Sequence, residues 1–221
     1  MPRKAKNGRQ TKSNGNFYID FKNTAQRMAW AAFQQHDVLF LIGPAGVGKS
    51  YLSCAFAIEQ ILNRQKKKIV LTRPIVESGE KLGFLPGEFE NKVHPYMMPM
   101  YDCIDRLVGG NEAQEERIDK CMEIAPIAYM RGRTFHDSVC IFDEAQNANL
   151  KQLKLFLTRF GENSKIIVTG DPKQSDLDGD VALVEVLDKL RGVNGVGIVE
   201  FKSDSIVRHP LVSKIIEKLE A

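Results

Sequence analysis

The sequence predicts an α/β fold in which a parallel sheet is covered by helices on both faces, giving three layers. Short runs of continuously apolar residues alternate with segments of helical periodicity, and a glycine-rich turn joins the first run to the helix that follows. An apolar run without polar alternation is typical of a strand that is buried on both faces. At 221 residues, the chain is the right size for one domain.

The predicted elements follow one another in a regular order. Strands are predicted for residues 38–42, 69–72, 139–142, 165–169 and 195–201. Helices are predicted for residues 23–36, 49–62, 150–160, 181–190 and 211–219. Residues 74–137 interrupt this order with five prolines and several glycines. A stretch of that length is too long for a plain connection in a compact domain, so we expect a functional insertion containing short helices, such as one over 112–122.

The charge of the chain is concentrated at its start. The first 12 residues carry five of the 31 basic side chains and no acidic one, so 26 basic and 28 acidic side chains remain for the rest. We therefore expect a basic tail over 1–16 and an ordered domain over 17–221. Such a tail can bind phosphate backbones, but short basic termini are more often simply solvated. The chain has neither an apolar run of the ~20 residues that span a membrane nor a signal-like start, so we expect a cytoplasmic location.

The glycine-rich turn matches the phosphate-binding pattern G-x-x-x-x-G-K-[ST] in full, with a predicted strand before it and a helix after it. Glycines allow successive N–H groups to point at an anion, and the helix adds the positive end of its dipole. We expect Lys49 to contact the β- and γ-phosphates of ATP and Ser50 to ligate Mg²⁺. The predicted nucleotide-binding residues of this segment are Gly43, Pro44, Ala45, Gly46, Val47, Gly48, Lys49, Ser50 and Tyr51.

Two further polar segments follow predicted strands. Asp143 and Glu144 follow the strand over 139–142, and Gln174 lies just beyond the strand over 165–169. Asp143 is predicted to hold Mg²⁺, Glu144 to polarise the attacking water, and Gln174 to sense the γ-phosphate. An acidic pair alone is also an ordinary helix start, and Gly-Asp-Pro alone is an ordinary turn. The phosphate loop gives these residues their significance.

Several longer strings resemble one family over nearly the whole chain from about residue 23. DEAQ (143–146) and GDPKQ (170–174) resemble motifs II and III of superfamily 1 helicases. The strings LTRPIVESGEKLGFLPG (71–87), EIAPIAYMRGRTF (123–135), FDEAQNANLKQLKLFLTRFG (142–161) and VRHPLV (207–212) are similar to the PhoH family of P-loop ATPases. The resemblance implies an ATP- and Mg²⁺-dependent domain, a ring-shaped oligomer that is typically a hexamer, and a role on RNA. Single-domain members are common in phage genomes, so a phage source, with a location in the host cytoplasm, is compatible with it.

Roles are also expected for Gln26 and for three arginines of the quoted strings. Gln26 is similar to the helicase Q motif, in which an amide reads the adenine edge and favours ATP over GTP. The arginines at positions 73, 131 and 133 are suited to phosphates by their planar donors, and we expect them to contact RNA or a neighbouring subunit's nucleotide. Solvated side chains or local ion pairs are the alternative for Arg73, Arg131 and Arg133.

Helicases of this kind complete hydrolysis with an arginine from a second domain, which this sequence does not show. We therefore expect a neighbouring subunit of a ring to supply it, with Arg208 as first candidate and Arg159 as second. The alternative for Arg208 is an ion pair at a helix start. The function expected is an RNA-remodelling, helicase-like ATPase. A nucleotide-gated RNA-binding switch with slow hydrolysis is the alternative, and Glu144 and Gln174 argue against a small-molecule kinase.

Overall fold

The computed structural model describes residues 17–74, 89–175 and 181–207, together with residues 211, 212, 215 and 218. Its helices are α1 (Thr24–Gln35), α2 (Lys49–Leu62), α3 (Phe89–Val108), α4 (Glu112–Cys121), α5 (Leu150–Leu157) and α6 (Ala182–Leu190). Its strands are β1 (Val38–Ile42), β2 (Lys68–Thr72), β3 (Met122–Ile124), β4 (Ser138–Phe142), β5 (Lys165–Gly170) and β6 (Val196–Glu200). Short 3₁₀ turns are η1 (Ile127–Met130), η2 (Ala145–Asn147) and η3 (Ser203–Ser205).

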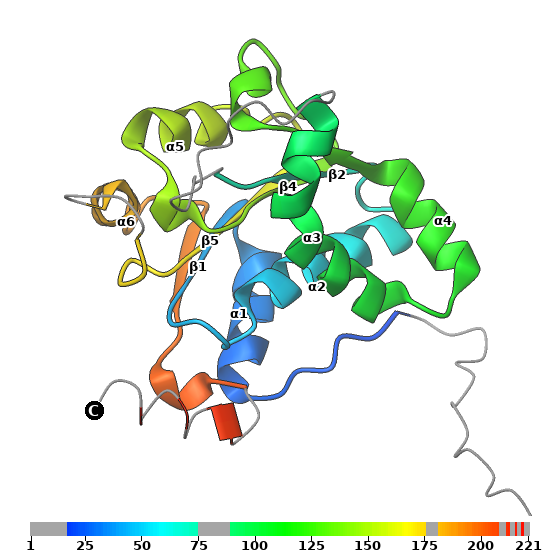
Figure 1. Cartoon of the computed structure of the whole chain (residues 1–221). Coiled ribbons are helices and arrows are strands. Elements are labelled where there is room, and N and C mark those ends of the chain that lie inside the picture. The colour runs from blue at the N-terminus through cyan, green and yellow to red at the C-terminus, as the bar shows by residue number, and fades with distance from the viewer. Residues whose placement is uncertain are drawn as a thin grey trace, which may run out of the picture.

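The six strands form one sheet in the order β3-β2-β4-β5-β1-β6, and every pairing is parallel. Helices α2, α3 and α4 lie on one side of this sheet, and α5 and α6 lie on the other (Figure 1). The predicted three-layer α/β fold is therefore confirmed. Because all strands run the same way, the segments that follow β1, β2, β4 and β5 meet at one edge, where ligands bind in folds of this kind.

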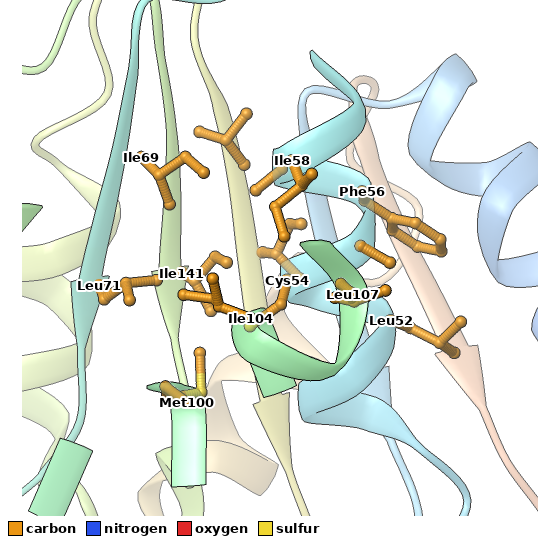
Figure 2. Close-up of a cluster of buried hydrophobic side chains, with 14 of the residues drawn as sticks. Leu52, Cys54, Phe56, Ile58, Ile69, Leu71, Met100, Ile104, Leu107 and Ile141 are labelled. Carbon is orange, nitrogen blue, oxygen red and sulfur yellow. The ribbon is translucent and has the colours of Figure 1, made fainter. Parts of the chain in front are cut away.

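The apolar strands fill both layers by alternation. Leu39, Leu41, Ile69 and Ile141 belong to the core beneath α2 and α3, and Figure 2 shows Ile69, Leu71 and Ile141 beside Cys54 and Ile58 of α2. The intervening strand residues face the opposite core, which α5 and α6 cover; they are Phe40, Ile42, Val70, Cys140, Phe142, Ile166 and Val168. A strand with two buried faces cannot alternate with polar residues, which explains the continuous apolar runs.

In the segment predicted to be an insertion with short helices, α4 matches the helix expected over 112–122, whereas α3 differs from the prediction. Helix α3 is 20 residues long and contains Pro95 and Pro99, although each internal proline removes a backbone hydrogen bond. Met97, Met100, Ile104 and Leu107 recur at helical spacing and are buried in the core against α2. This packing compensates for the prolines, because tertiary burial contributes more to helix stability than intrinsic propensity does.

The same segment also supplies β3, a strand that was not predicted. Residues 69–71 of β2 pair with residues 122–124 of β3 at the edge of the sheet. The segment thus contributes to the core and to the sheet, while its functional role stays a prediction.

The other predicted elements lie within a few residues of the observed ones. The largest difference at an end is in α5, which stops at Leu157 rather than at residue 160. The predicted tail and most of the predicted helix over 211–219 lie outside the described residues. Within the described part of the chain, no helix is long and apolar enough to cross a membrane.

Candidate functional site

The glycine-rich turn forms a curled loop between β1 and α2. Gly43, Gly46 and Gly48 have φ values of 151°, 88° and 92°, which side chains other than hydrogen rarely permit. A Cβ on Gly43 would lie 2.7 Å from the carbonyl oxygen of Phe201, because the chain after β6 passes directly behind the loop. Gly48 is the N-cap of α2 in the left-handed conformation. The loop therefore needs glycine at both ends for steric reasons.

Lys49, the first residue of α2, folds back over the loop. Its Nζ donates to the carbonyl oxygens of Gly43 at 2.6 Å and Pro44 at 3.0 Å. The ammonium group is thus held against the curled backbone of the loop. A lysine held there can contact bound phosphates as a point charge.

Ser50 and Asp143 come together although they are 93 residues apart. The Ser50 Oγ donates to Asp143 Oδ1 at 2.8 Å, and the Thr169 Oγ1 donates to the same oxygen. Because β5 lies between β4 and β1, Thr169 at its end is placed between the other two residues. The Asp143 side chain is almost fully buried, with 1% of its surface exposed.

This cluster fits a magnesium ion by the chemistry of its donors. Mg²⁺ prefers hard oxygen ligands and is commonly held by one or two carboxylates together with phosphates and water. Ser50 and Asp143 offer a hydroxyl and a carboxylate beside the phosphate loop, while Thr169 fixes the orientation of the carboxylate. The residues present are therefore suited to the ion, and Ser50 and Asp143 are the ones that could hold it.

Glu144 lies next to this cluster and is held from two sides. Its backbone is left-handed, with φ 53° and ψ 43°, an uncommon conformation for a residue with a side chain. The Gln146 Nε2 donates to Glu144 Oε2 at 2.6 Å, and Arg73 Nη2 lies 3.4 Å from Glu144 Oε1. These two contacts fix the Glu144 carboxylate at the same edge of the sheet.

Gln146 links the two segments that resemble helicase motifs. It is buried, and its Oε1 accepts a hydrogen bond from the Asp171 backbone N at 3.0 Å. Its backbone oxygen accepts one from Ser175 Oγ at 3.2 Å. Gln174 has an exposed side chain at the same turn, and its backbone N donates to the Asp171 carbonyl oxygen. Its role as a γ-phosphate sensor stays a prediction.

A cavity of about 300 Å³ opens beside the phosphate loop and is large enough for a nucleotide base. Its lining comes from the N-terminal segment, the loop, α2, α3 and the chain near residue 207, namely Asp20, Lys22, Gln26, Gly46, Gly48, Tyr51, Arg106 and Val207. Burial raises the pKa of the Tyr51 phenol, and the negative charge of Asp20 raises it further. The half-buried phenol stays neutral at physiological pH and offers an aromatic ring and a donor.

Gln26 lines this cavity, but its amide is already bound within the chain. Its Nε2 donates to the Val47 carbonyl oxygen at 3.0 Å, and its Oε1 accepts from the Lys22 backbone N at 2.9 Å. Gln26 is also buried, with 3% of its surface exposed. This geometry favours support of the phosphate loop over direct reading of a base edge.

The structure separates the three arginines that were grouped as candidates for RNA. Arg73 lies at Glu144. Arg133 forms an ion pair with Glu123 at 2.5 Å and stacks over the Phe135 ring, which agrees with the alternative of a local pair. Arg131 is exposed.

The candidates for an arginine supplied to a neighbouring subunit also differ. Arg159 donates to the carbonyl oxygens of Leu155 and Arg133, so its guanidinium is bound within its own chain. Arg208 lies outside the described residues.

The sequence prediction missed three contributors to the site. Gln146 lies within a quoted motif string and Thr169 directly precedes another, but their roles depend on which strands are neighbours. Arg106 enters the cavity from α3, a helix whose prolines concealed it. One usable signal for Thr169 was its place at the end of an apolar strand, where Asp143 also follows one.

A phosphate loop beside a buried carboxylate, at one edge of a parallel sheet, defines a P-loop NTPase domain. Comparison with known families agrees and narrows the class. The family model described as PhoH-like protein matches residues 18–220, and the chain belongs to this family.

Two relatives illustrate the extent of the match. A PhoH-like protein of Bacillus subtilis (strain 168) is 47% identical over 201 residues, covering 90% of this chain and 63% of the relative. Protein PhoH of Escherichia coli (strain K12) is 41% identical over 200 residues, covering 88% of this chain and 56% of the relative. The chain thus spans somewhat more than half the length of these curated relatives.

Solved structures with a similar arrangement are more distant. The Pif1 helicase from Candida albicans gives a TM-score of 0.46 at 15% identity, covering 91% of this chain and 44% of that one. The Sulfolobus solfataricus SWI2/SNF2 ATPase core in complex with dsDNA gives 0.48 at 13% identity, covering 87% of this chain and 47% of that one.

Proposed function

We propose that this chain binds ATP with Mg²⁺, hydrolyses it, and uses the cycle to remodel RNA as a ring-shaped homo-oligomer. The observation that carries the ATPase part is the hydrogen-bonded contact between Ser50 of the phosphate loop and the buried Asp143. It brings a phosphate-binding loop and an oxygen ligand set for magnesium into one place. Glu144, the next residue, adds a carboxylate that is suited to accept a proton from water.

Each residue has a defined task in this proposal. The loop N–H groups and Lys49 bind the phosphates and orient the γ-phosphoryl group. Ser50 and Asp143 would hold Mg²⁺, which would neutralise negative charge on the nucleotide phosphates. Glu144 Oε1 or Oε2 accepts the proton of the attacking water. Tyr51 and the cavity beside the loop, in which Gln26 supports Val47, take the base.

The RNA and ring parts rest on the PhoH resemblance and on the arginine that a partner contributes in other P-loop enzymes. An arginine contributed by a partner raises the rate by on the order of 10³–10⁵ in P-loop enzymes. Arg159 is bound to carbonyl groups of its own chain, which favours Arg208 as the arginine given to a neighbouring subunit. A head-to-tail ring would place one subunit's Arg208 at the next subunit's site.

A second candidate function is a nucleotide-gated RNA-binding switch with slow hydrolysis. The contacts of Arg73 and Gln146 with Glu144 favour this switch, because both oxygens of the carboxylate already face donors within the protein. Phosphate release with and without single-stranded RNA separates the two. Strong stimulation supports the remodelling ATPase, whereas RNA binding that depends on ATP but leaves turnover slow supports the switch.

Complementation tests the ring. Arg208→Ala subunits have an intact ATP site but lack the donated arginine, and Lys49→Ala subunits have the reverse defect. We expect mixed rings to recover part of the ATPase rate that each variant lacks alone. Rings that assemble from both variants without any recovery would contradict a donated Arg208.

A further inference from the structure

Arg73 connects three parts of the molecule at the site edge. It directly follows β2, and its Nη2 lies 3.4 Å from Glu144 Oε1. Its Nη1 donates to the backbone oxygen of Tyr96 in α3 at 3.3 Å. The side chains of Arg73 and Glu144 are 22% and 34% exposed, so the pair is partly shielded but open to solvent.

The register of the sheet places this contact. Thr72 of β2 pairs with Phe142 of β4, and the Asp143 backbone N donates to the Thr72 carbonyl oxygen at 3.0 Å. Arg73 directly follows Thr72, and Glu144 directly follows Asp143. Arg73 and Glu144 therefore leave the sheet side by side. The contact is fixed by two buried strands, unlike an ion pair between two free surface side chains.

The other oxygen of Glu144 is held as well. Gln146 Nε2 donates to Oε2, and the other end of that amide accepts from the Asp171 backbone N. A carboxylate that accepts a proton from water must present an oxygen to that water at hydrogen-bond distance. With Arg73 on one oxygen and Gln146 on the other, the direction of the Glu144 carboxylate is set by the protein.

Of the two residues that contact the Glu144 carboxylate, Arg73 is the one that can bind a nucleic-acid phosphate instead. A guanidinium presents a planar set of donors that matches a phosphate as well as a carboxylate. The Gln146 amide is buried and bound at both ends, so it offers no such exchange. A phosphodiester close to Arg73 would compete with Glu144 for the same donors.

We propose that Arg73 is a positioning residue that restrains Glu144 until a polynucleotide phosphate binds the guanidinium, so that strand binding releases the carboxylate for hydrolysis. This inference rests on the proposed ATPase function and adds the link between the strand and the chemistry. It predicts that turnover is slow without a strand. The coupling needs two arrangements of one side chain, either on Glu144 or on phosphate, and no larger movement.

The test measures phosphate release with and without poly(U) for the wild type, Arg73→Gln and Arg73→Lys. Lys67→Gln is the matched control, because Lys67 pairs with Asp137 at 2.7 Å on the surface, at the opposite end of β2 from Arg73. Glu144→Gln in the Arg73→Gln background shows whether any gain in rate passes through Glu144. Arg73→Lys keeps the charge and guards against a folding defect from the lost contact with Tyr96.

We expect Arg73→Gln to raise the basal rate roughly two- to fivefold. This is the factor by which a partly exposed ion pair can shift the equilibrium between restrained and released Glu144. The stimulation by poly(U) should fall towards a ratio of one. Arg73→Lys should give an intermediate ratio, Lys67→Gln should match the wild type, and the double variant should be as slow as Glu144→Gln. A changed ratio is not expected from a merely structural role, which would lower both rates together.

Three results overturn the inference in distinguishable ways. A wild type that releases phosphate no faster than Lys49→Ala overturns the proposed ATPase function and, with it, the coupling. A wild type that hydrolyses ATP, while Arg73→Gln and Arg73→Lys keep its basal rate and its poly(U) ratio, overturns the role of Arg73 alone. A basal rate that falls with an unchanged ratio also contradicts the restraint.

Discussion

Ser50 Oγ donates a hydrogen bond to Asp143 Oδ1 at 2.8 Å, across the end of β5. This contact joins the phosphate loop to a buried carboxylate, and Thr169 holds the same oxygen from the intervening strand. Hydrogen bonds within the protein thus arrange the ligand set, which lowers the cost of organising it on binding.

The first prediction concerns this ligand set. Asp143→Asn should remove the Mg²⁺-dependent part of ATP binding, because an amide oxygen carries no charge to hold the ion. Thr169→Val should weaken Mg²⁺-dependent ATP binding by roughly 10- to 100-fold, since Thr169 only orients the carboxylate. Calorimetric titration with ATP in the presence and absence of Mg²⁺ measures both. Asp37→Asn, at the opposite end of β1, is the control, and equal Mg²⁺ dependence in all four proteins would contradict the assignment.

The second prediction concerns Gln26. Because its amide is bound to Val47 and to the Lys22 backbone, Gln26→Ala should loosen the phosphate loop. We expect the affinities for ATP and for GTP to fall by a similar factor. That factor is roughly fivefold for each net hydrogen bond lost, at about 1 kcal/mol per bond. Competition binding with the two nucleotides measures the ratio. If the affinity for ATP fell while the affinity for GTP did not, Gln26 would contact the base, as the resemblance to the Q motif first suggested.

The third prediction is a dependence of stability on pH. The hydrogen bond from Arg133, together with Lys68, holds the pKa of the Glu123 carboxyl below its ordinary value of 4.5. A carboxyl whose pKa is lowered by folding stabilises the protein above that ordinary value and loses this contribution as the pH falls through the lowered pKa. Glu123→Gln should therefore reduce the free energy of unfolding by roughly 1 kcal/mol at pH 7, with the difference closing in acid.

Denaturant unfolding between pH 7 and pH 3 measures this difference. Glu116→Gln is a suitable control, because the Glu116–Lys120 pair is largely exposed, with 69% and 71% of the two side chains accessible. A Glu123→Gln difference that stayed constant across the pH range would show that the pair contributes nothing through ionisation.

Much of the fold could be predicted because burial on two faces leaves a simple pattern in each strand. The run Val38–Ile42 shows it and matches β1 as observed. Helix α3 escaped prediction because Pro95 and Pro99 lower its local propensity, whereas its stability comes from burial of residues such as Met100 against α2. The prolines are visible in the sequence, whereas the burial of this helix against α2 is not.

The site was predictable where one segment carries a whole function, as the phosphate loop does. It was not predictable where partners come from separate strands. Arg73 could be recognised as a phosphate-type residue, but its position beside Glu144 depends on β2 and β4 being neighbours. Arg133 has the same residue type and pairs with Glu123 instead, so composition alone could not separate their roles.

The central claim is that this site hydrolyses ATP through Glu144. ATP turnover, measured beside ATP binding, for the wild type, Glu144→Gln and Lys49→Ala tests it most directly. Glu144→Gln should bind ATP within about twofold of the wild type and turn it over roughly 10²–10⁴ times more slowly, whereas Lys49→Ala should lose binding as well. A Glu144→Gln protein that bound ATP normally and hydrolysed it at the wild-type rate would contradict the account.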